Sequence, residues 1–73
     1  MEKEREILVR ALVSFEPGSY KIEDICSDIR QQHPDIPPDV IVPENVIEAL
    51  ELLPILYNVN THHRTARRRP ARF

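Results

Sequence analysis

The sequence predicts a mainly α-helical α+β fold, in which three helices are joined by a small β element near the C-terminus. Three stretches carry apolar side chains at helical spacing, and each is followed by a proline that ends the helix. Residues 55–60 alternate as a strand does. At 73 residues, with 41% hydrophobic and 30% charged side chains, the chain has the composition of one small globular domain.

The first two helices are predicted over residues 2–15 and 22–32. The first ends before Pro17, and the second ends before Pro34. Between them, residues 20–22 form no more than a strand stub. The side chains expected to be buried are Ile7, Leu8, Ala11, Leu12 and Phe15 in the first helix, and Ile22, Ile25, Cys26 and Ile29 in the second.

A proline-rich connection over residues 33–42 leads to the third helix, which is expected to begin at Pro43 and to be terminated by Pro54. Three apolar side chains should hold the connection against the core: Ile36, Val40 and Ile41. The buried stripe of the third helix is expected to be Val46, Ile47, Leu50 and Leu53.

The formal net charge of −2 conceals a strong asymmetry. Residues 1–60 contain all twelve acidic side chains against five basic ones, which gives −7. Residues 61–73 contain five arginines and no acid, which gives +5. We therefore divide the chain into a helical domain over residues 1–60 and a basic wing or C-terminal tail over residues 61–73.

The order helix, strand stub, helix, helix, strand and basic segment is that of a winged helix-turn-helix domain. Two segments carry a closer likeness, IEDICSDIRQQHPDIP at residues 22–37 and VIEALELL at residues 46–53. Over about residues 5–60 the chain resembles the DNA-binding half of ferric-uptake-regulator-type repressors. The resemblance implies a winged-helix fold. The connection before the third helix is longer than in that family, and the metal-sensing, dimerising half has no counterpart in this sequence, so metal sensing is not carried over.

The basic segment is the first candidate for function, because its arginines need solvent or anions around them. Guanidinium groups match phosphate oxygens in bidentate geometry, and neutralising phosphates releases counterions, which makes the affinity depend on salt. The residues expected to contact nucleic acid here are His62, His63, Arg64, Arg67, Arg68, Arg69 and Arg72. The alternatives are self-association, a protein partner, or a solubilising tail that folds back on the acidic domain.

The third helix would read the major groove in a conventional helix-turn-helix protein, and Asn45 is its best donor to base edges. Its outward face opposes that role. Glu44, Glu48 and Glu51 form one acidic stripe, which phosphates would repel. The stripe indicates either a surface that binds a basic protein partner or a solvated helix face.

Catalysis and metal binding are not expected. Cys26 lies in an apolar stripe, so we interpret it as a core residue and not as a nucleophile. His62 and His63 are adjacent, and neighbours on an extended segment point to opposite sides. A single glycine excludes a glycine-rich phosphate loop. We therefore expect no enzyme activity, no metal site and no cofactor.

Our first hypothesis is a small nucleic-acid-binding protein, regulatory or architectural, that contacts phosphates through the basic segment, with DNA favoured over RNA. The alternative is a winged-helix protein-interaction module that uses the acidic third-helix face and the basic tail, and a homo-oligomer is a further possibility. No apolar run approaches the roughly 18 residues that would span a bilayer, so no membrane association is expected. The lone cysteine and the charged start fit a cytoplasmic protein.

Overall fold

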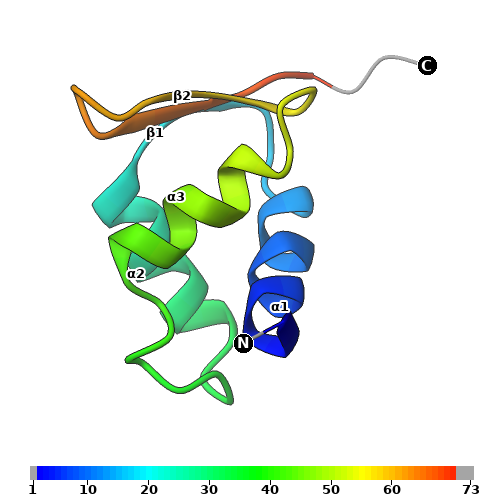
Figure 1. Ribbon diagram of the computed structural model, residues 1–73, viewed down its shortest axis with the longest axis vertical. Helices are drawn as coiled ribbons and strands as arrows, with labels where there is room; N and C mark the ends of the chain where they lie inside the picture. The colour runs from blue at the N-terminus through cyan, green and yellow to red at the C-terminus, as the bar shows by residue number, and fades with distance from the viewer. Residues whose placement is uncertain (1, 71–73) are drawn as a thin grey trace.

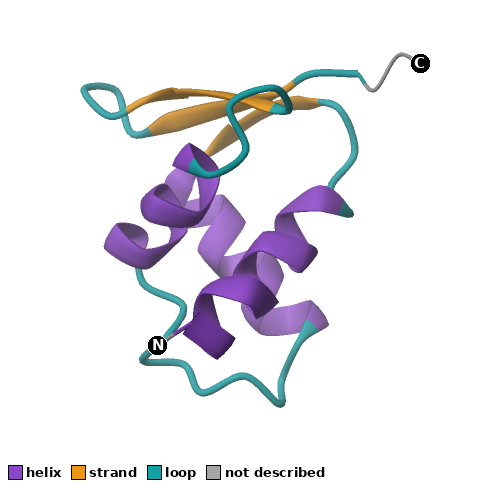
Figure 2. Ribbon diagram, turned by 45° about the vertical axis from the view of Figure 1, so that its right-hand side comes forward, coloured by secondary structure: helices purple, strands orange, loops and turns teal. Residues whose placement is uncertain are grey.

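The computed structural model describes residues 2–70, in which three helices lie beneath one face of a three-stranded antiparallel sheet (Figure 1). In Figure 2 the helices and the sheet form two separate layers. No helix among these residues combines the length and the apolar character that crossing a membrane requires. In chain order the elements are α1 (Glu2–Val13), β1 (Gly18–Lys21), α2 (Ile22–Gln32), α3 (Pro43–Glu51), β2 (Tyr57–Asn60) and β3 (Thr65–Arg68).

The core lies between the helices and the inner face of the sheet. All four side chains expected from α2 are buried. Of the five expected from the first helix, four are buried, including Phe15, which follows the end of α1. Ile7 is the exception, with 40% of its surface exposed. In α3, Val46 and Leu50 are buried as expected, whereas Ile47 and Leu53 are only partly buried and Ala49 completes the stripe.

The helix ends follow local hydrogen bonding. α1 ends two residues before the predicted Phe15, because both the hydroxyl and the backbone N–H of Ser14 donate to the carbonyl of Ala11, at 2.7 and 3.2 Å. α3 begins at Pro43 as expected and ends at Glu51. The N–H of Leu52 there donates back to the Ala49 carbonyl at 3.1 Å, which tightens the last turn before Pro54.

Two side chains fasten the proline-rich connection to the helices on either side of it. The guanidinium of Arg30 on α2 donates to the carbonyl of Ile41 at 2.6 Å. The side-chain amide of Asn45 on α3 donates to the carbonyl of Val40 at 3.0 Å. Ile36 and Ile41 are buried and Val40 packs against the core, so the expected apolar anchoring of this segment is confirmed.

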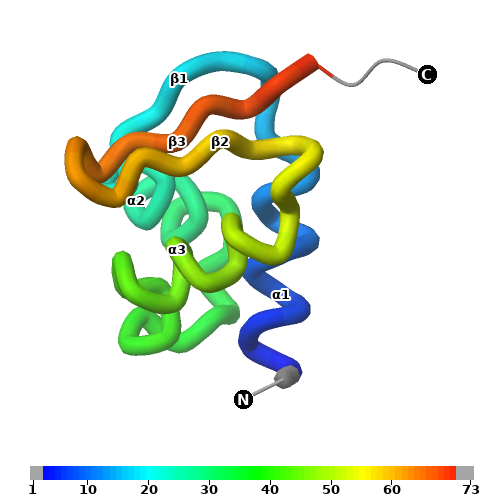
Figure 3. The backbone as a smooth tube through the Cα atoms, turned by 45° about the horizontal axis from the view of Figure 1, so that its top comes forward, coloured from blue at the N-terminus to red at the C-terminus, as the bar shows by residue number. Residues whose placement is uncertain are grey.

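The sheet order is β1-β3-β2, with both pairs antiparallel (Figure 3). β2 covers the last four residues of the strand predicted over residues 55–60, because residues 55 and 56 lie in a turn. β1 begins two residues before the predicted stub and ends at Lys21, where α2 follows. β3 lies within the basic segment of residues 61–73, for which the sequence left open a wing or a C-terminal tail. β3 is the central strand, and Ala66 on it is 2% exposed within the core. Residues 65–68 therefore belong to the same folded body as the helices.

A tight turn over residues 61–64 joins β2 to β3. Its last residue, Arg64, has φ of 55°, a left-handed conformation that lets the chain reverse. The carbonyl of Arg64 accepts the N–H of Ile22 at 2.9 Å, at the start of α2. This hydrogen bond fixes the end of the hairpin to a helix.

Candidate nucleic-acid interface

The sheet turns one face toward the helices and the other toward solvent, because side chains alternate along each strand. The inward residues include Tyr57, Ala66 and Arg68, which are all buried. The outward face is polar at each position within the paired strands. Its residues, which we call the outer sheet face, are Ser19, Lys21, Asn58, Asn60, Thr65 and Arg67.

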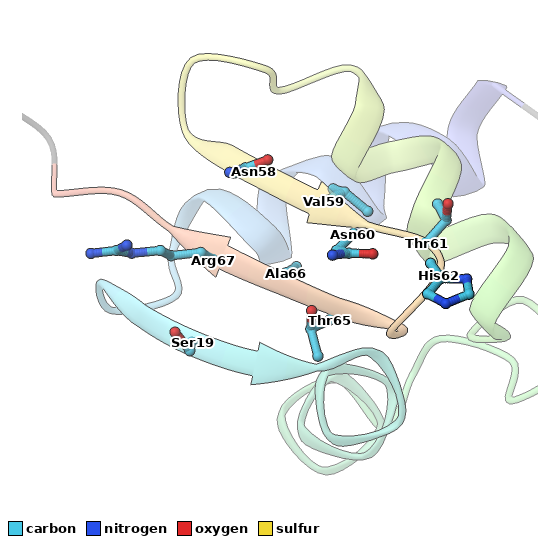
Figure 4. A pocket seen from close by; sticks show the side chains of 9 residues that line it. All are labelled: Ser19, Asn58, Val59, Asn60, Thr61, His62, Thr65, Ala66 and Arg67. Atoms are coloured by element: carbon cyan, nitrogen blue, oxygen red, sulfur yellow. The ribbon is translucent and has the colours of Figure 1, made fainter.

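Arg67 occupies the centre of the outer sheet face. It lies on the middle strand, directly opposite Ser19 on β1 and Asn58 on β2. The residues around it line an open hollow that continues to His62 on the hairpin turn (Figure 4). Ser19 and Asn58 flank the base of the Arg67 side chain, and its guanidinium extends away from the hollow (Figure 4). Short hydroxyl and amide side chains line the hollow itself and can donate hydrogen bonds to an anion that Arg67 attracts.

The outer sheet face is positively charged. Lys21 and Arg67 supply two cations, and none of the six residues is acidic. Arg69 adds a third exposed cation just beyond β3, and its backbone N–H donates to the Leu56 carbonyl at 2.7 Å. Lys21 interacts electrostatically with the nearby Glu23 carboxylate. The polar donors, together with Arg67 and Arg69, suit an anionic partner better than an apolar one.

Arg64 is partly neutralised within the chain. Its guanidinium lies 2.6 Å from the carboxylate of Glu23 at the start of α2, and both side chains are about half exposed. The hydrogen bond from Arg64 holds the pKa of the Glu23 carboxyl below its ordinary value. Arg64 therefore presents less free charge to a phosphate than Arg67 does.

Arg68 does not reach the outer sheet face, contrary to the expectation that it contacts nucleic acid. It is 8% exposed, and its guanidinium donates to the carbonyl of Val13 at 3.3 Å and to the carbonyl of Arg69. The same group lies over the ring of Tyr57, 5.9 Å from the ring centre. Arg68 is therefore directed into the domain, where it contacts the C-terminal end of α1.

The third helix presents the surface that its sequence indicated. Glu44, Glu48 and Glu51 are all exposed. Asn45 is partly buried, and the bond to Val40 already uses its side-chain amide as a donor, so it is poorly placed to read a base edge. The exposed face of α3 therefore carries carboxylates, whereas a helix that reads the major groove would carry hydrogen-bond donors to base edges.

The two histidines of the turn are exposed, with their rings edge to face and 5.0 Å between ring centres. The backbone N–H of His63 donates to the side-chain oxygen of Asn60 at 3.1 Å, which orders the turn. Among residues 2–70, no three His, Cys, Asp or Glu side chains come together as a metal site. The contact expected of Arg72 falls outside the described residues.

Sequence reasoning missed most of the outer sheet face, because that face exists only once β3 is recognised. Lys21 belonged to a strand stub, and the two asparagines of β2 had no assigned role. One weak signal was present. Thr65 to Arg68 places a small apolar residue, Ala66, between polar ones, which is compatible with a short strand.

Comparisons with protein families, with curated proteins and with solved structures reveal no match to this chain.

Proposed function

We propose that this protein is a winged-helix domain that binds nucleic acid through the phosphate backbone, using the outer sheet face and the adjoining hairpin. The winged-helix assignment is supported by the element order and by the β2–β3 hairpin, which has the position of a wing. The single observation that carries the binding proposal is Arg67, which is exposed at the centre of a polar sheet face that also carries Lys21 and no acid.

The mode of binding follows from what each surface offers. Arg67, Arg69 and Lys21 can each neutralise one phosphate, and the nearby hydroxyl and amide groups can add hydrogen bonds to phosphate and sugar oxygens. The acidic stripe on α3 would be repelled from the major groove. The domain therefore approaches with its sheet and not with its third helix, and it discriminates little between base sequences. DNA is our preferred partner, on the resemblance noted in the sequence.

Fluorescence anisotropy with a short labelled DNA duplex, over a series of salt concentrations, tests this proposal. Three phosphate contacts give a slope of about −2.7 in log affinity against log salt. Arg67→Ala should weaken binding and reduce the magnitude of the slope by about 0.9. Lys3→Ala is the matched control, because Lys3 is also cationic and exposed but lies on α1.

Absence of binding at low salt, or equal losses in Arg67→Ala and Lys3→Ala, would contradict the proposal. Binding that depends strongly on duplex sequence would contradict the backbone mode. A single-stranded oligonucleotide of the same length gives a further comparison. In the described strands no aromatic ring faces outward to stack on bases, so single strands should gain nothing over the duplex.

A second candidate function is a module that binds a basic protein through α3. The observation that favours it is that Glu44, Glu48 and Glu51 are all exposed along one side of the helix. Glu44→Lys, combined with nuclease treatment before capture of partners, separates the two functions. Loss of one protein partner with retention of DNA binding would favour this second candidate.

A further inference from the structure

We propose that the surface around Leu52, between α1 and α3, binds a second copy of this chain about a two-fold axis. Leu52 follows the end of α3, and 54% of its surface is exposed. An exposed leucine alone is ordinary. The arrangement of charges on its two sides points to a partner.

Two shallow hollows meet at Leu52. One is lined mainly by α1, and the other lies mainly along the last turns of α3. Leu52 and Arg5 line both hollows, so these two side chains lie at the junction. We call the whole set the Leu52 surface, and its members are Arg5, Glu6, Val9, Arg10, Glu48, Glu51 and Leu52.

The two sides of the Leu52 surface differ in sign. On the α1 side, Arg10 pairs with Glu6 at 2.9 Å, so Arg5 supplies the net positive charge, and Val9 adds partly buried apolar surface. On the α3 side, Glu48 and Glu51 are both exposed and α3 itself supplies no cation. The surface therefore has an apolar centre with a basic side and an acidic side.

This pattern selects a second copy over other partners. A partner of one sign would be attracted to one side and repelled by the other. A two-fold rotation about Leu52 places the basic side of each copy against the acidic side of the other, so both contacts are attractive at once. An interface related by a two-fold axis must be self-complementary in this way. The apolar centres then meet as Leu52 against Leu52.

The required area is compatible with the size of the chain. A stable interface buries about 800 Å² on each partner, which is about 15% of the 5255 Å² that the chain exposes. The interface would also leave the outer sheet face free, because no residue is shared between the two surfaces. The inference is therefore independent of the proposed function.

Sedimentation equilibrium over about 1 µM to 1 mM protein tests for the dimer. Leu52→Ser should weaken dimerisation about tenfold or more. Ile7→Ser is the matched control. Ile7, on α1, is a large apolar side chain that is exposed like Leu52, at 40%, but it lines neither hollow. Thermal unfolding of each variant shows that it is folded.

Charge exchange distinguishes a two-fold interface from an effect within one chain. Arg5→Glu and Glu51→Lys should each weaken self-association about tenfold, since each places like charges at both symmetric contacts. An equimolar mixture of the two variants should recover the affinity of the parent as a heterodimer, because both of its contacts are again attractive. Raising the salt concentration should weaken the parent dimer.

A protein that stays monomeric at the highest concentration overturns the proposal. So does a dimer that loses no more in Leu52→Ser than in Ile7→Ser. A mixture of the two charge variants that associates no better than either alone also overturns it, since that result excludes the two-fold pairing. Arg67→Ala should dimerise as the parent does. Loss of dimerisation in this variant would indicate that the contact lies on the outer sheet face and would overturn the proposal.

Discussion

Arg67 and Arg68 are neighbours on β3, and the structure predicts opposite consequences when each is replaced by methionine. Arg67 faces solvent, and Arg68 is buried against the end of α1. Arg67→Met should reduce nucleic-acid binding and leave stability nearly unchanged. Arg68→Met should reduce stability and leave the salt slope of binding unchanged wherever the protein is still folded. Methionine preserves most of the aliphatic length, so the comparison isolates the guanidinium.

The cost of Arg68→Met can be worked out from its contacts. The guanidinium makes charge-assisted bonds to two carbonyls, and such bonds contribute about 1.5–3 kcal/mol. Its charge at the C-terminal end of α1 adds about 0.3–1 kcal/mol. Burial of the charge opposes both contributions, and Val13 is 45% exposed, so water can replace part of the lost bonding. We expect a net loss of about 1–2 kcal/mol in the free energy of unfolding.

Thermal unfolding followed by circular dichroism measures this difference. In a domain of this size, 1 kcal/mol corresponds to about 4–8 °C, so Arg68→Met should lower Tm by about 4–16 °C. Arg67→Met should change it by less than about 4 °C, as expected for an exposed position. If Arg68→Met kept the parent Tm and weakened binding as Arg67→Met does, β3 would be shifted by one residue, since such a shift exchanges the two faces.

Three further predictions concern ionisable groups. Burial raises the pKa of Tyr57 to about 12, so the contribution of the neutral hydroxyl to stability is complete below about pH 10 and is lost between pH 10 and pH 12. Tyr57→Phe should therefore flatten the pH dependence of the free energy of unfolding, measured in urea, over this interval. An equal effect of Tyr20→Phe would contradict this. The hydrogen bond from Arg64 lowers the pKa of Glu23, so the pair's contribution to stability is present above about pH 4.5 and disappears as the pH falls through the pKa that Glu23 has in the folded protein. Arg64→Ala should raise the pKa of Glu23 in a carboxyl NMR titration. An unchanged pKa would contradict the pairing. Burial raises the pKa of the Cys26 thiol, so alkylation should be slow in the native protein and fast in denaturant; rapid native alkylation would exclude a core position.

The helices could be predicted because their signals are local. Apolar spacing and prolines lie within each segment, so the limits of α2 and the first residue of α3 followed directly from the sequence. Ile7 shows the limit of this reasoning. It lies at the edge of the stripe on α1, and only the packing of the other elements decides that it stays 40% exposed.

The local sequence predicts β3 poorly, because this central strand pairs with β1, which lies far away in sequence, as well as with its neighbour β2. Ala66 is its one apolar inward residue, and Arg68 occupies the inward position where a hydrophobic side chain would signal a strand. That arginine is accommodated because Val13 and Tyr57 provide an acceptor and a ring for it. These partners are 55 and 11 positions distant in sequence, so no local pattern reveals them.

The position of the arginines on a folded sheet changes the electrostatic argument for binding. A free tail would extend beyond the Debye length of about 8 Å at physiological salt and act apart from the acidic helices. On the sheet, the cations are fixed to a body with extents of 31 × 28 × 21 Å. At about 10 mM salt the Debye length grows to about 30 Å, so an approaching phosphate should sense the net charge of −2 as well as Arg67. Plots of log affinity against log salt should therefore flatten toward 10 mM in anisotropy titrations. A slope that stays constant to the lowest salt would instead require cations that act independently of the helices.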